Sequence, residues 1–535
     1  MLNVCVGVLA NSKLNSLKIE ETKSLNTAQD LNEEDEYTGE LEISTAEFRK
    51  YSGDLFYNIF LIFSSNFAIE GENYFFSKFL KILEEAQLYN ENNNNNSTNN
   101  EEYLTVIEVI IFFARNLIEA MNSNHHFEFM TQFMKTIIKS NSISNEKILH
   151  SFILLLKEGT TIIPKDIENF SLIIQFLTNL IKKSNLSSIA CEVLLSISEN
   201  LTFPNIDCFN FCFTIFEEKY DFLSVNSLLQ ITESLCNIIG ILDKDTNTII
   251  QLKEEQVFEL FSLIIKPSIN RIKSTYNNIM NHTFEDINIV KLEFLKNYGI
   301  ISTVLKRSFK LNSVVLENIF IFFMNETILY TEGIYKILAK ESSFIKELNI
   351  LFSEIIKNIG FNAINFFEKL NEIFVSSYLI NSENYLSLEI VGCLYSEVIA
   401  YSNEKKQIVS KNFQFLGSKV LDDISNSNNR HQIEIVEIFA NFIIKITETI
   451  SYLCIDKEFF DRLILIYSEA IQRITDPKVN KAIVKLFNYI ISFPSIFNRD
   501  FVFPHFGNIL SALFKSIGHF ENGISQEVNL KLNYF

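Results

Sequence analysis

The segment "HQIEIVEIFANFIIKITETI", residues 431–450, confines its polar residues to one narrow stripe. They follow one another at intervals of 3, 4, 4 and 3 residues: Glu434, Glu437, Asn441, Lys445 and Glu448. This spacing is that of one face of an α-helix, and the rest of the helix surface is apolar. Such a helix must be packed on two or three sides, because a single neighbour would leave most of its apolar surface in water. The segment therefore predicts a stacked layer of helices.

Residues that interrupt helices are rare along the whole chain. The 535 residues include 14 Gly and 6 Pro, against usual frequencies of about 7% and 5%. This scarcity leaves little room for tight turns or a many-stranded sheet. Helices are expected near 44–65, 101–121, 124–139, 165–183, 186–201, 205–220, 224–242, 284–306, 342–359, 382–402, 429–452, 456–474 and 477–493.

Long helices with short breaks predict an all-α fold built from repeated helical hairpins. About twenty helices of roughly 15–22 residues would form pairs of roughly 40–47 residues, the period of HEAT and armadillo repeats. We therefore expect an α-solenoid that forms a superhelical arch. An irregular all-α globule is the alternative, and it is disfavoured because a single core is hard to build from so long a chain.

The chain divides into two regions. Residues 1–43 are expected to be a partly disordered acidic segment or the remnant of a preceding repeat, and 44–535 to be the solenoid. The tract "NENNNNNSTNN", residues 90–100, predicts a disordered surface insertion because it cannot form a core. Ser44 with Glu47 fits a capping box, and Asp476 before Pro477 is a typical helix start.

The charge balance argues against two kinds of partner. Lys plus Arg total 46 and Asp plus Glu total 65, which gives a formal net charge of −19. An acidic surface repels phosphate backbones and attracts basic proteins, so direct nucleic-acid binding is not expected. Apolar runs are interrupted by Glu108, Arg115, Glu317 and Glu326, and no run reaches about 18–20 residues. No membrane insertion is expected.

Residues for catalysis or metal binding are not apparent. Nucleotide-binding, nucleophile-elbow and metalloprotease motifs are missing, so we expect no catalytic, cofactor or metal site. Cys208 and Cys212 lie one helical turn apart, but their apolar surroundings favour core thiols over a metal site. His125 and His126 are adjacent and would point apart on a helix. The seven dispersed cysteines are typical of reduced thiols in an intracellular protein.

The start of the solenoid carries a family resemblance. Acidic residues at 33–36 precede Glu47, Phe48 and Arg49 at the head of a helix. This order resembles the "D-x-x-x-F-x-E-F-R" segment of nuclear transport receptors of the importin-β superfamily, in the branch of transportin-3 and importin-13. In that family the segment opens a repeat in the middle of the arch. The three residues are a landmark and not a binding site.

Later helices keep the order of that family. "YLTVIEVIIFFARNL" resembles its "W-x-x-x-E-A-x-L-F" helix, with Tyr103 at the Trp, Glu108 at the acid and Phe112 at the aromatic position. Helix 186–201 resembles a small-residue helix, with Ala190 at a close helix approach. The series continues with 292–307, 385–399, 433–446 and 476–491, so the resemblance covers about 40–515.

The resemblance implies a receptor that carries basic protein cargo into the nucleus. The complete receptor would bind Ran-GTP and nucleoporin repeats, act as a monomer and shuttle between cytoplasm and nucleus. Because the matches begin in mid-arch, we expect this chain to lack the N-terminal Ran-binding repeats. The cargo helix of transportin-3 is rich in Arg. The corresponding stretch, 342–360, has Lys346 and Lys357 as its only cations, which makes them candidate cargo contacts without bidentate phosphate recognition.

Two other functions fit the sequence. A HEAT or armadillo scaffold that organises a cytoplasmic complex without any transport role needs only the repeat pattern. An all-α enzyme is the least favoured, because no constellation of catalytic residues is apparent.

Overall fold

The structure is a computed structural model, and its regular elements are helices throughout the residues that it describes. These are residues 45–92, 97–118, 124–163, 167–183, 186–201, 206–244, 253–284, 286–308, 313–401, 403–426, 431–449, 457–492 and 499–521. The predicted all-α solenoid of helical hairpins is confirmed. The predicted segment 1–43 and the capping residue Ser44 lie outside the described residues.

The chain forms two compact units, Met1–Leu252 and Lys253–Phe535. The helices of the first unit are α2 (Thr45–Asn92), α3 (Ser97–Leu117), α4 (Asn124–Lys139), α5 (Glu146–Glu158), α6 (Ile167–Lys183), α7 (Ser187–Glu199), α8 (Ile206–Lys219) and α9 (Val225–Lys244). Short 3₁₀ turns, η2 (Asn141–Ser144) and η3 (Gly159–Thr161), flank α5.

The second unit begins with α10 (Glu254–Met280), α11 (Ile287–Ser308), α12 (Ser313–Ile337) and α13 (Ser342–Ile359). After η5 (Gly360–Phe366) come α14 (Phe367–Ile380), η6 (Ser382–Asn384) and α15 (Leu386–Tyr401). It continues with α16 (Asn403–Asn426), α17 (His431–Thr449), α18 (Lys457–Arg473), α19 (Pro477–Ser492) and α20 (Arg499–Glu521).

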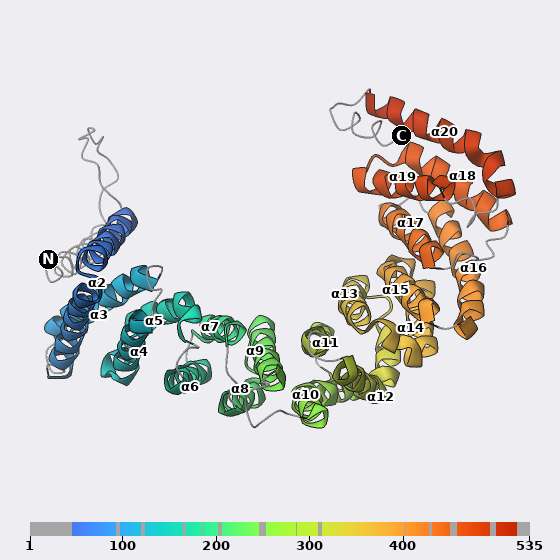
Figure 1. Cartoon of the computed structure of the whole chain (residues 1–535). Helices are drawn as coiled ribbons and strands as arrows, with labels where there is room; N and C mark the ends of the chain where they lie inside the picture. The colour runs from blue at the N-terminus through green and yellow to red at the C-terminus, as the bar shows by residue number, and fades with distance from the viewer. Residues whose placement is uncertain are drawn as a thin grey trace, which may run out of the picture. The chain divides into compact units, whose positions relative to one another are not determined.

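Within each unit the helices form two layers. Odd-numbered helices stack on one another, from α3 to α9 and again from α11 to α19, and the even-numbered helices α10 to α20 form a second row. Hairpin partners such as α10 and α11, or α14 and α15, join the layers. In the second unit, the odd-numbered helices follow the inner side of the unit's curve (Figure 1). This inner layer holds the predicted polar-striped helix, α17.

Apolar side chains fill the space between the layers. In α17 the residues between the polar positions, such as Val436, Phe439 and Ile443, are buried, as the stripe predicts. Aromatic stacking is prominent in the first unit, where the ring centroids of Phe56 and Phe113 lie 4.2 Å apart and those of Phe76 and Phe129 lie 4.0 Å apart. Phenylalanine therefore supplies much of the apolar area that stabilises the stack.

Ion pairs join successive helices of the same layer. Lysine and arginine pairs in the odd-numbered layers include Arg115–Glu158, Lys157–Glu192 and Lys357–Glu389, and those in the even-numbered layers include Lys182–Glu218, Lys273–Glu326, Lys369–Glu332, Lys405–Glu368 and Arg462–Asp422. Partners are 32 to 53 residues apart in the chain, which brackets the predicted repeat length. Most of these pairs are partly exposed, so each contributes about 0–1 kcal/mol to the free energy of unfolding. Their main effect is on how successive helices align with one another.

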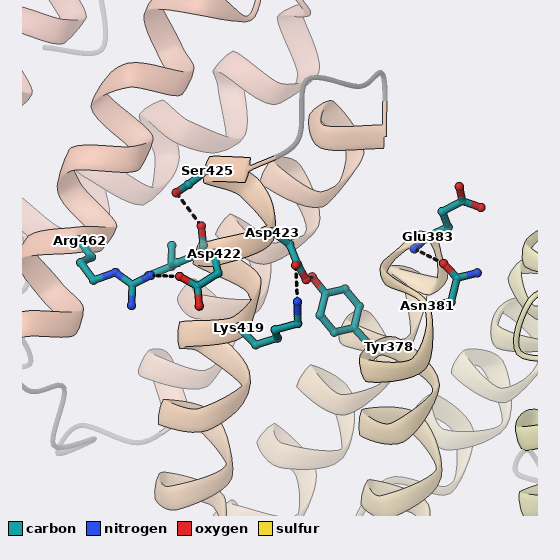
Figure 2. A network of polar contacts seen from close by, with 9 residues as sticks. Tyr378, Asn381, Glu383, Lys419, Asp422, Asp423, Ser425 and Arg462 are labelled. Carbon is teal, nitrogen blue, oxygen red and sulfur yellow. Dashed lines mark hydrogen bonds and ion pairs between the residues drawn. The ribbon is translucent and has the colours of Figure 1, made fainter.

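A polar network ties three outer helices together. Tyr378 of α14 donates to Asp423 Oδ2 of α16 at 2.9 Å, and Lys419 forms an ion pair with the same carboxylate. Figure 2 shows the Tyr378 ring pointing at Asp423, and Arg462 of α18 reaching the neighbouring Asp422. The chain that leaves α14 then passes through Asn381, whose side chain accepts from the Glu383 backbone N–H at 3.1 Å. This anchors the turn that carries Glu383.

Several helix bounds differ from expectation. The helix expected at 44–65 continues as α2 to Asn92, because Phe75, Phe79 and Leu83 repeat at helical spacing and are buried. α2 and α3 also reach into the Asn-rich tract from both sides, and 93–96 lie outside the described residues. Helices α5, α10, α12, α14, α16 and α20 were not among the expected segments.

Among the residues that the structure describes, two helical stretches are long and apolar enough to cross a membrane by length and composition alone, Val225–Leu242 and Val314–Ile337. The first packs against α7 and α8. The second lies between α10 and α14, and its carboxylates Glu326 and Glu332 pair with lysines of those neighbours. Both therefore have the contacts of helices inside a helical stack.

Candidate functional site

A cleft of about 450 Å³ opens where four helices of the inner layer begin. Its walls come from the first residues of α13 and α17 and from the residues just before α15 and α19. The lining residues are Ser342, Ser343, Lys346, Glu383, Tyr385, Ile433, Glu434 and Asp476. Stacking of successive odd-numbered helices places these positions together, although they span more than 130 residues of sequence.

Helix-start chemistry explains why the cleft is acidic. Asp476 Oδ1 accepts from the backbone N–H groups of Lys478 at 2.8 Å and Val479 at 3.2 Å, which confirms the predicted start of α19. Glu434 lies in the first turn of α17. Carboxylates are favoured at such positions because they satisfy free N–H groups and interact with the positive end of the helix dipole. The same preference concentrates negative charge where the helix starts meet.

A hydrogen-bonded chain crosses the cleft. Lys346 Nζ lies 3.3 Å from the Tyr385 hydroxyl and 5.8 Å from the centre of the Tyr385 ring. The Tyr385 hydroxyl donates to the Glu434 carboxylate. Burial, and then the bond to Glu434, raises the pKa of Tyr385 well above its ordinary value. Tyr385 therefore stays neutral at physiological pH and acts as a fixed bridge between α13 and α17.

Negative charge predominates in the cleft. Glu383, Glu434 and Asp476 face one ammonium group, that of Lys346. The hydroxyl of Ser342 donates to Glu383 Oε2 at 2.6 Å. Carboxylate oxygens accept several hydrogen bonds each, so this arrangement can hold a lysine or arginine side chain from another molecule.

The two predicted cargo lysines have different surroundings. Lys346 lines the cleft, whereas Lys357, near the other end of α13, is not among the lining residues and lies 3.0 Å from Glu389 of α15. Burial lowers the pKa of Lys357, but the hydrogen bond and charge of Glu389 outweigh it and the net shift is upward. Lys357 is thus charged and held by its partner. A cargo contact by either lysine remains a prediction.

The landmark residues Glu47, Phe48 and Arg49 belong to the first turn of α2. Their side chains lie outside what the structure describes. The structure places them at the beginning of the first described helix and adds no contact, so their role as a family landmark stays a prediction.

The thiols behave as core residues. Cys208 and Cys212 are buried, and burial raises the pKa of Cys208 to about 12 and that of Cys212 further. The described part of the chain brings no three His, Cys, Asp or Glu side chains together as a metal site. His126 is buried with its Nε2 3.0 Å from Glu72 Oε2, while the side chain of His125 lies outside the described residues.

The first unit has a cleft of its own, of about 560 Å³, on α2, α3 and α5. Its carboxylates are Asp54 and Glu158, and Arg115 forms an ion pair with Glu158 inside it. Because half of this negative charge is neutralised, the cleft of the second unit is the stronger candidate for binding a cation.

The sequence predicts Glu434 as a polar-stripe residue and Asp476 as a helix start, but it predicts neither as part of a binding site. Residues 385–399 and 433–446 stand out as helices, but Tyr385 and Glu434 are not distinguished from other polar helix-start residues. A usable signal exists in the regular placement of a carboxylate at or before successive helix starts. It becomes informative only once the repeat register is known.

Comparison with known proteins gives the fold a context. No protein-family model and no curated protein sequence matches the chain. Among solved structures, importin 13 in its cytosolic state has a TM-score of 0.61 at 12% identity, over 89% of this chain and 51% of that one. Kap95p, in a structure on the switch loops of RanGDP, has a TM-score of 0.51 at 10% identity, over 96% of this chain and 59% of that one.

Kap95 in complex with Nup1 has a TM-score of 0.50 at 10% identity, over 93% of this chain and 53% of that one. This chain spans between 51% and 59% of the length of these structures. All three are karyopherins of the importin-β kind. The chain has the fold of their HEAT-repeat solenoids.

Proposed function

We propose that the chain is the cargo-binding part of a nuclear transport receptor, and that the acidic cleft of its second unit binds basic segments of protein cargo. The cleft carries this proposal because three carboxylates face one ammonium on the inner layer of a karyopherin-like solenoid. This is a binding function and not a catalytic one.

Electrostatics gives the proposal a magnitude. A unit charge 4 Å from one carboxylate gains roughly 1 kcal/mol in water and about 4 kcal/mol near a protein surface. A cargo lysine or arginine between Glu434 and Asp476 would interact favourably with both carboxylates. The net gain in binding free energy is smaller than the sum of the two Coulomb energies, because the cation also loses its hydration. A short peptide with several such residues would therefore bind with an affinity that falls steeply with added salt.

The finer features of the proposal come from the family resemblance. They are membership of the transportin-3 and importin-13 branch, import under Ran-GTP control, shuttling between cytoplasm and nucleus, and action as a monomer. The names of the neighbouring structures mention Ran and Nup1 and so support these kinds of partner. In this proposal, Ran-GTP and nucleoporin repeats bind the complete receptor.

Nucleoporin repeats would meet the outer layer. Large apolar side chains are exposed on three successive even-numbered helices: Phe415 on α16, Leu465 on α18, and Phe503 and Phe514 on α20. An apolar surface of this kind fits short apolar repeats, because each aromatic side chain that docks removes a large area from water.

The cleft can be tested with a fluorescent Lys/Arg-rich peptide. The variant Glu383→Gln/Glu434→Gln/Asp476→Asn removes three charges, while Gln keeps hydrogen-bonding capacity and Asn still caps α19. We expect fluorescence anisotropy to show binding weakened by roughly 10- to 100-fold. Glu469→Gln is a matched control, because Glu469 pairs with Arg473 on the exposed surface of α18. Equal binding by the triple variant would reject the cleft.

The transport role needs a separate test. A pull-down with the complete gene product should capture Ran-GTP and nucleoporin repeats. If it captures neither while the cleft still binds basic peptides, the scaffold function replaces the transport function.

A further inference from the structure

Helices α15 and α17 place a thiol and an amine in direct contact. Lys445 Nζ lies 3.1 Å from Cys393 Sγ, and an N–H of the lysine donates to the sulfur. Cys393 is 2% exposed and sits in the middle of α15. Lys445 belongs to the polar stripe of α17 and is half-buried. The two residues are 52 positions apart in sequence, so the contact depends on the packing of adjacent repeats.

The packing around the pair is tight. Gly392, next to Cys393, allows the close approach, because a Cβ there would lie 2.9 Å from the Phe442 ring of α17. Lys357 of α13 is also near enough to interact with Cys393 through charge, but its amine is engaged with Glu389. Lys445 is therefore the lysine at bonding distance from the sulfur.

We propose that Cys393 and Lys445 form a covalent cross-link when the protein meets a peroxide. In the first step the Cys393 sulfur attacks a peroxide oxygen, so that an S–O bond forms, the O–O bond breaks, and the thiol proton leaves with the departing hydroxide as one water. The product is a sulfenic acid, which can be captured by nearby nitrogen.

In the second step the amine of Lys445, 3.1 Å from the sulfur in the unmodified protein, attacks the sulfur. An S–N bond forms, the S–O bond breaks and a second water leaves. The sulfur loses two electrons overall, and they reduce one peroxide to two waters. The product is a sulfenamide that joins α15 to α17.

Other buried thiols provide internal controls. Burial raises the pKa of Cys191 and that of Cys208 to about 12. These side chains therefore remain protonated, and the protonated thiol reacts poorly with peroxide. The cross-link should be selective for Cys393, because Lys445 Nζ lies 3.1 Å from its sulfur.

The cross-link would also affect the cleft. α15 is preceded by Tyr385 and α17 begins near Glu434, so a bond between these helices fixes the spacing of two cleft walls. This consequence rests on the proposed function, whereas the cross-link itself does not.

The test is mass spectrometry of the full chain after hydrogen peroxide treatment and digestion. We expect a joined peptide pair that contains Cys393 and Lys445, lighter by about 2 Da than the sum of its parts, and released by dithiothreitol. Recovery of Cys393 as sulfinic or sulfonic acid, or unmodified while Cys208 is oxidised, would overturn the proposal.

Matched variants identify the nitrogen. Lys445→Arg keeps the charge but supplies a poor nucleophile, so the joined pair should disappear and Cys393 should oxidise further. Lys357→Arg should leave the yield unchanged. A joined pair of equal yield in Lys445→Arg contradicts the assignment, and circular dichroism confirms that each variant is folded. None of these measurements involves cargo, so their failure leaves peptide binding by the untreated chain unaffected.

Discussion

At the scale of single residues, the cleft shows how a side chain's role depends on its neighbours. Lys346 is predicted from sequence as a candidate cargo contact that could meet a phosphate only as a point charge. The structure surrounds it with carboxylates and places its amine against Tyr385. A lysine in that setting lowers the negative charge of the wall and orients Tyr385, which in turn bonds Glu434. The cleft then favours a cationic ligand, the opposite of what the lysine alone suggests.

Glu332 gives a pH prediction at the same scale. Its two carboxylate oxygens lie 2.6 Å from Lys336 Nζ and 2.7 Å from Lys369 Nζ, which joins α12 to α14. The hydrogen bonds from Lys336 and Lys369 lower its pKa. A carboxyl group with a lowered pKa in the folded state stabilises the protein above the unfolded pKa of about 4.3, and this contribution is lost as the pH falls through the folded value.

Glu332→Gln should therefore cost roughly 1 kcal/mol at neutral pH and little in acid. Thermal unfolding followed by circular dichroism at a series of pH values measures this difference. Glu372→Gln is the control, because Glu372 is more exposed and its ion pair among the described residues is with one lysine, Lys369. If Glu332→Gln lowers the free energy of unfolding by the same amount below pH 3 as at neutral pH, the lost stability is not electrostatic.

At the scale of helices, the sequence predicts those with a clean polar stripe and misses the others. α13 is found at 342–359 and α19 within one residue; a typical start at Asp476 and Pro477 marks α19. α10 and α20 are missed because each contains an interior proline, Pro267 and Pro504, which usually ends a helix. α16 is missed because its many lysines reduce the apolar signal that identifies a buried face.

The cleft could be predicted only in part. Lys346 and the start of α19 at Asp476 were recognised from local sequence, whereas the contact between Tyr385 and Glu434 depends on the stacking of α15 on α17. Local patterns specify which face of a helix is buried. They do not specify which distant helix start lies beside it.

One glycine in each layer, Gly392 of α15 and Gly507 of α20, provides the prediction at this scale. A methyl group at Gly392 would lie 2.9 Å from the ring of Phe442, which is 3% exposed and cannot move aside easily. Gly392→Ala should therefore force α15 away from α17 and cost about 1–3 kcal/mol. At Gly507 of α20 nothing lies within 4 Å of the added carbon. Gly507→Ala should raise stability by up to about 1 kcal/mol through helix propensity.

Thermal unfolding of the two variants side by side tests this contrast, because the chemical change is identical and only the surroundings differ. A stabilising Gly392→Ala would mean that the methyl group fits between α15 and α17 without displacing Phe442. A destabilising Gly507→Ala would mean that α20 has neighbours that limit its surface.

At the scale of the whole molecule, stability is distributed along the chain. Each helix packs on its hairpin partner and on its neighbours in the same layer, and ion pairs join successive repeats. In such an array the free energy of unfolding is close to a sum of repeat and nearest-neighbour contributions. No single core holds the chain together, so the two units need not unfold together.

The last prediction follows from that distribution. The four helices that bring the cleft together, α13, α15, α17 and α19, all belong to the unit that begins at Lys253. A fragment of residues 253–535 should therefore stay helical and bind the basic peptide within about threefold of the full chain, because nearest-neighbour contacts suffice. A shorter fragment, 253–426, keeps Lys346, Glu383 and Tyr385 but lacks α17 and α19. It should stay helical and bind much more weakly.

Circular dichroism with peptide anisotropy on both fragments separates folding from binding. Loss of helix in 253–535 would show that the units depend on each other for folding, and equal affinity of the two fragments would place the peptide outside the cleft.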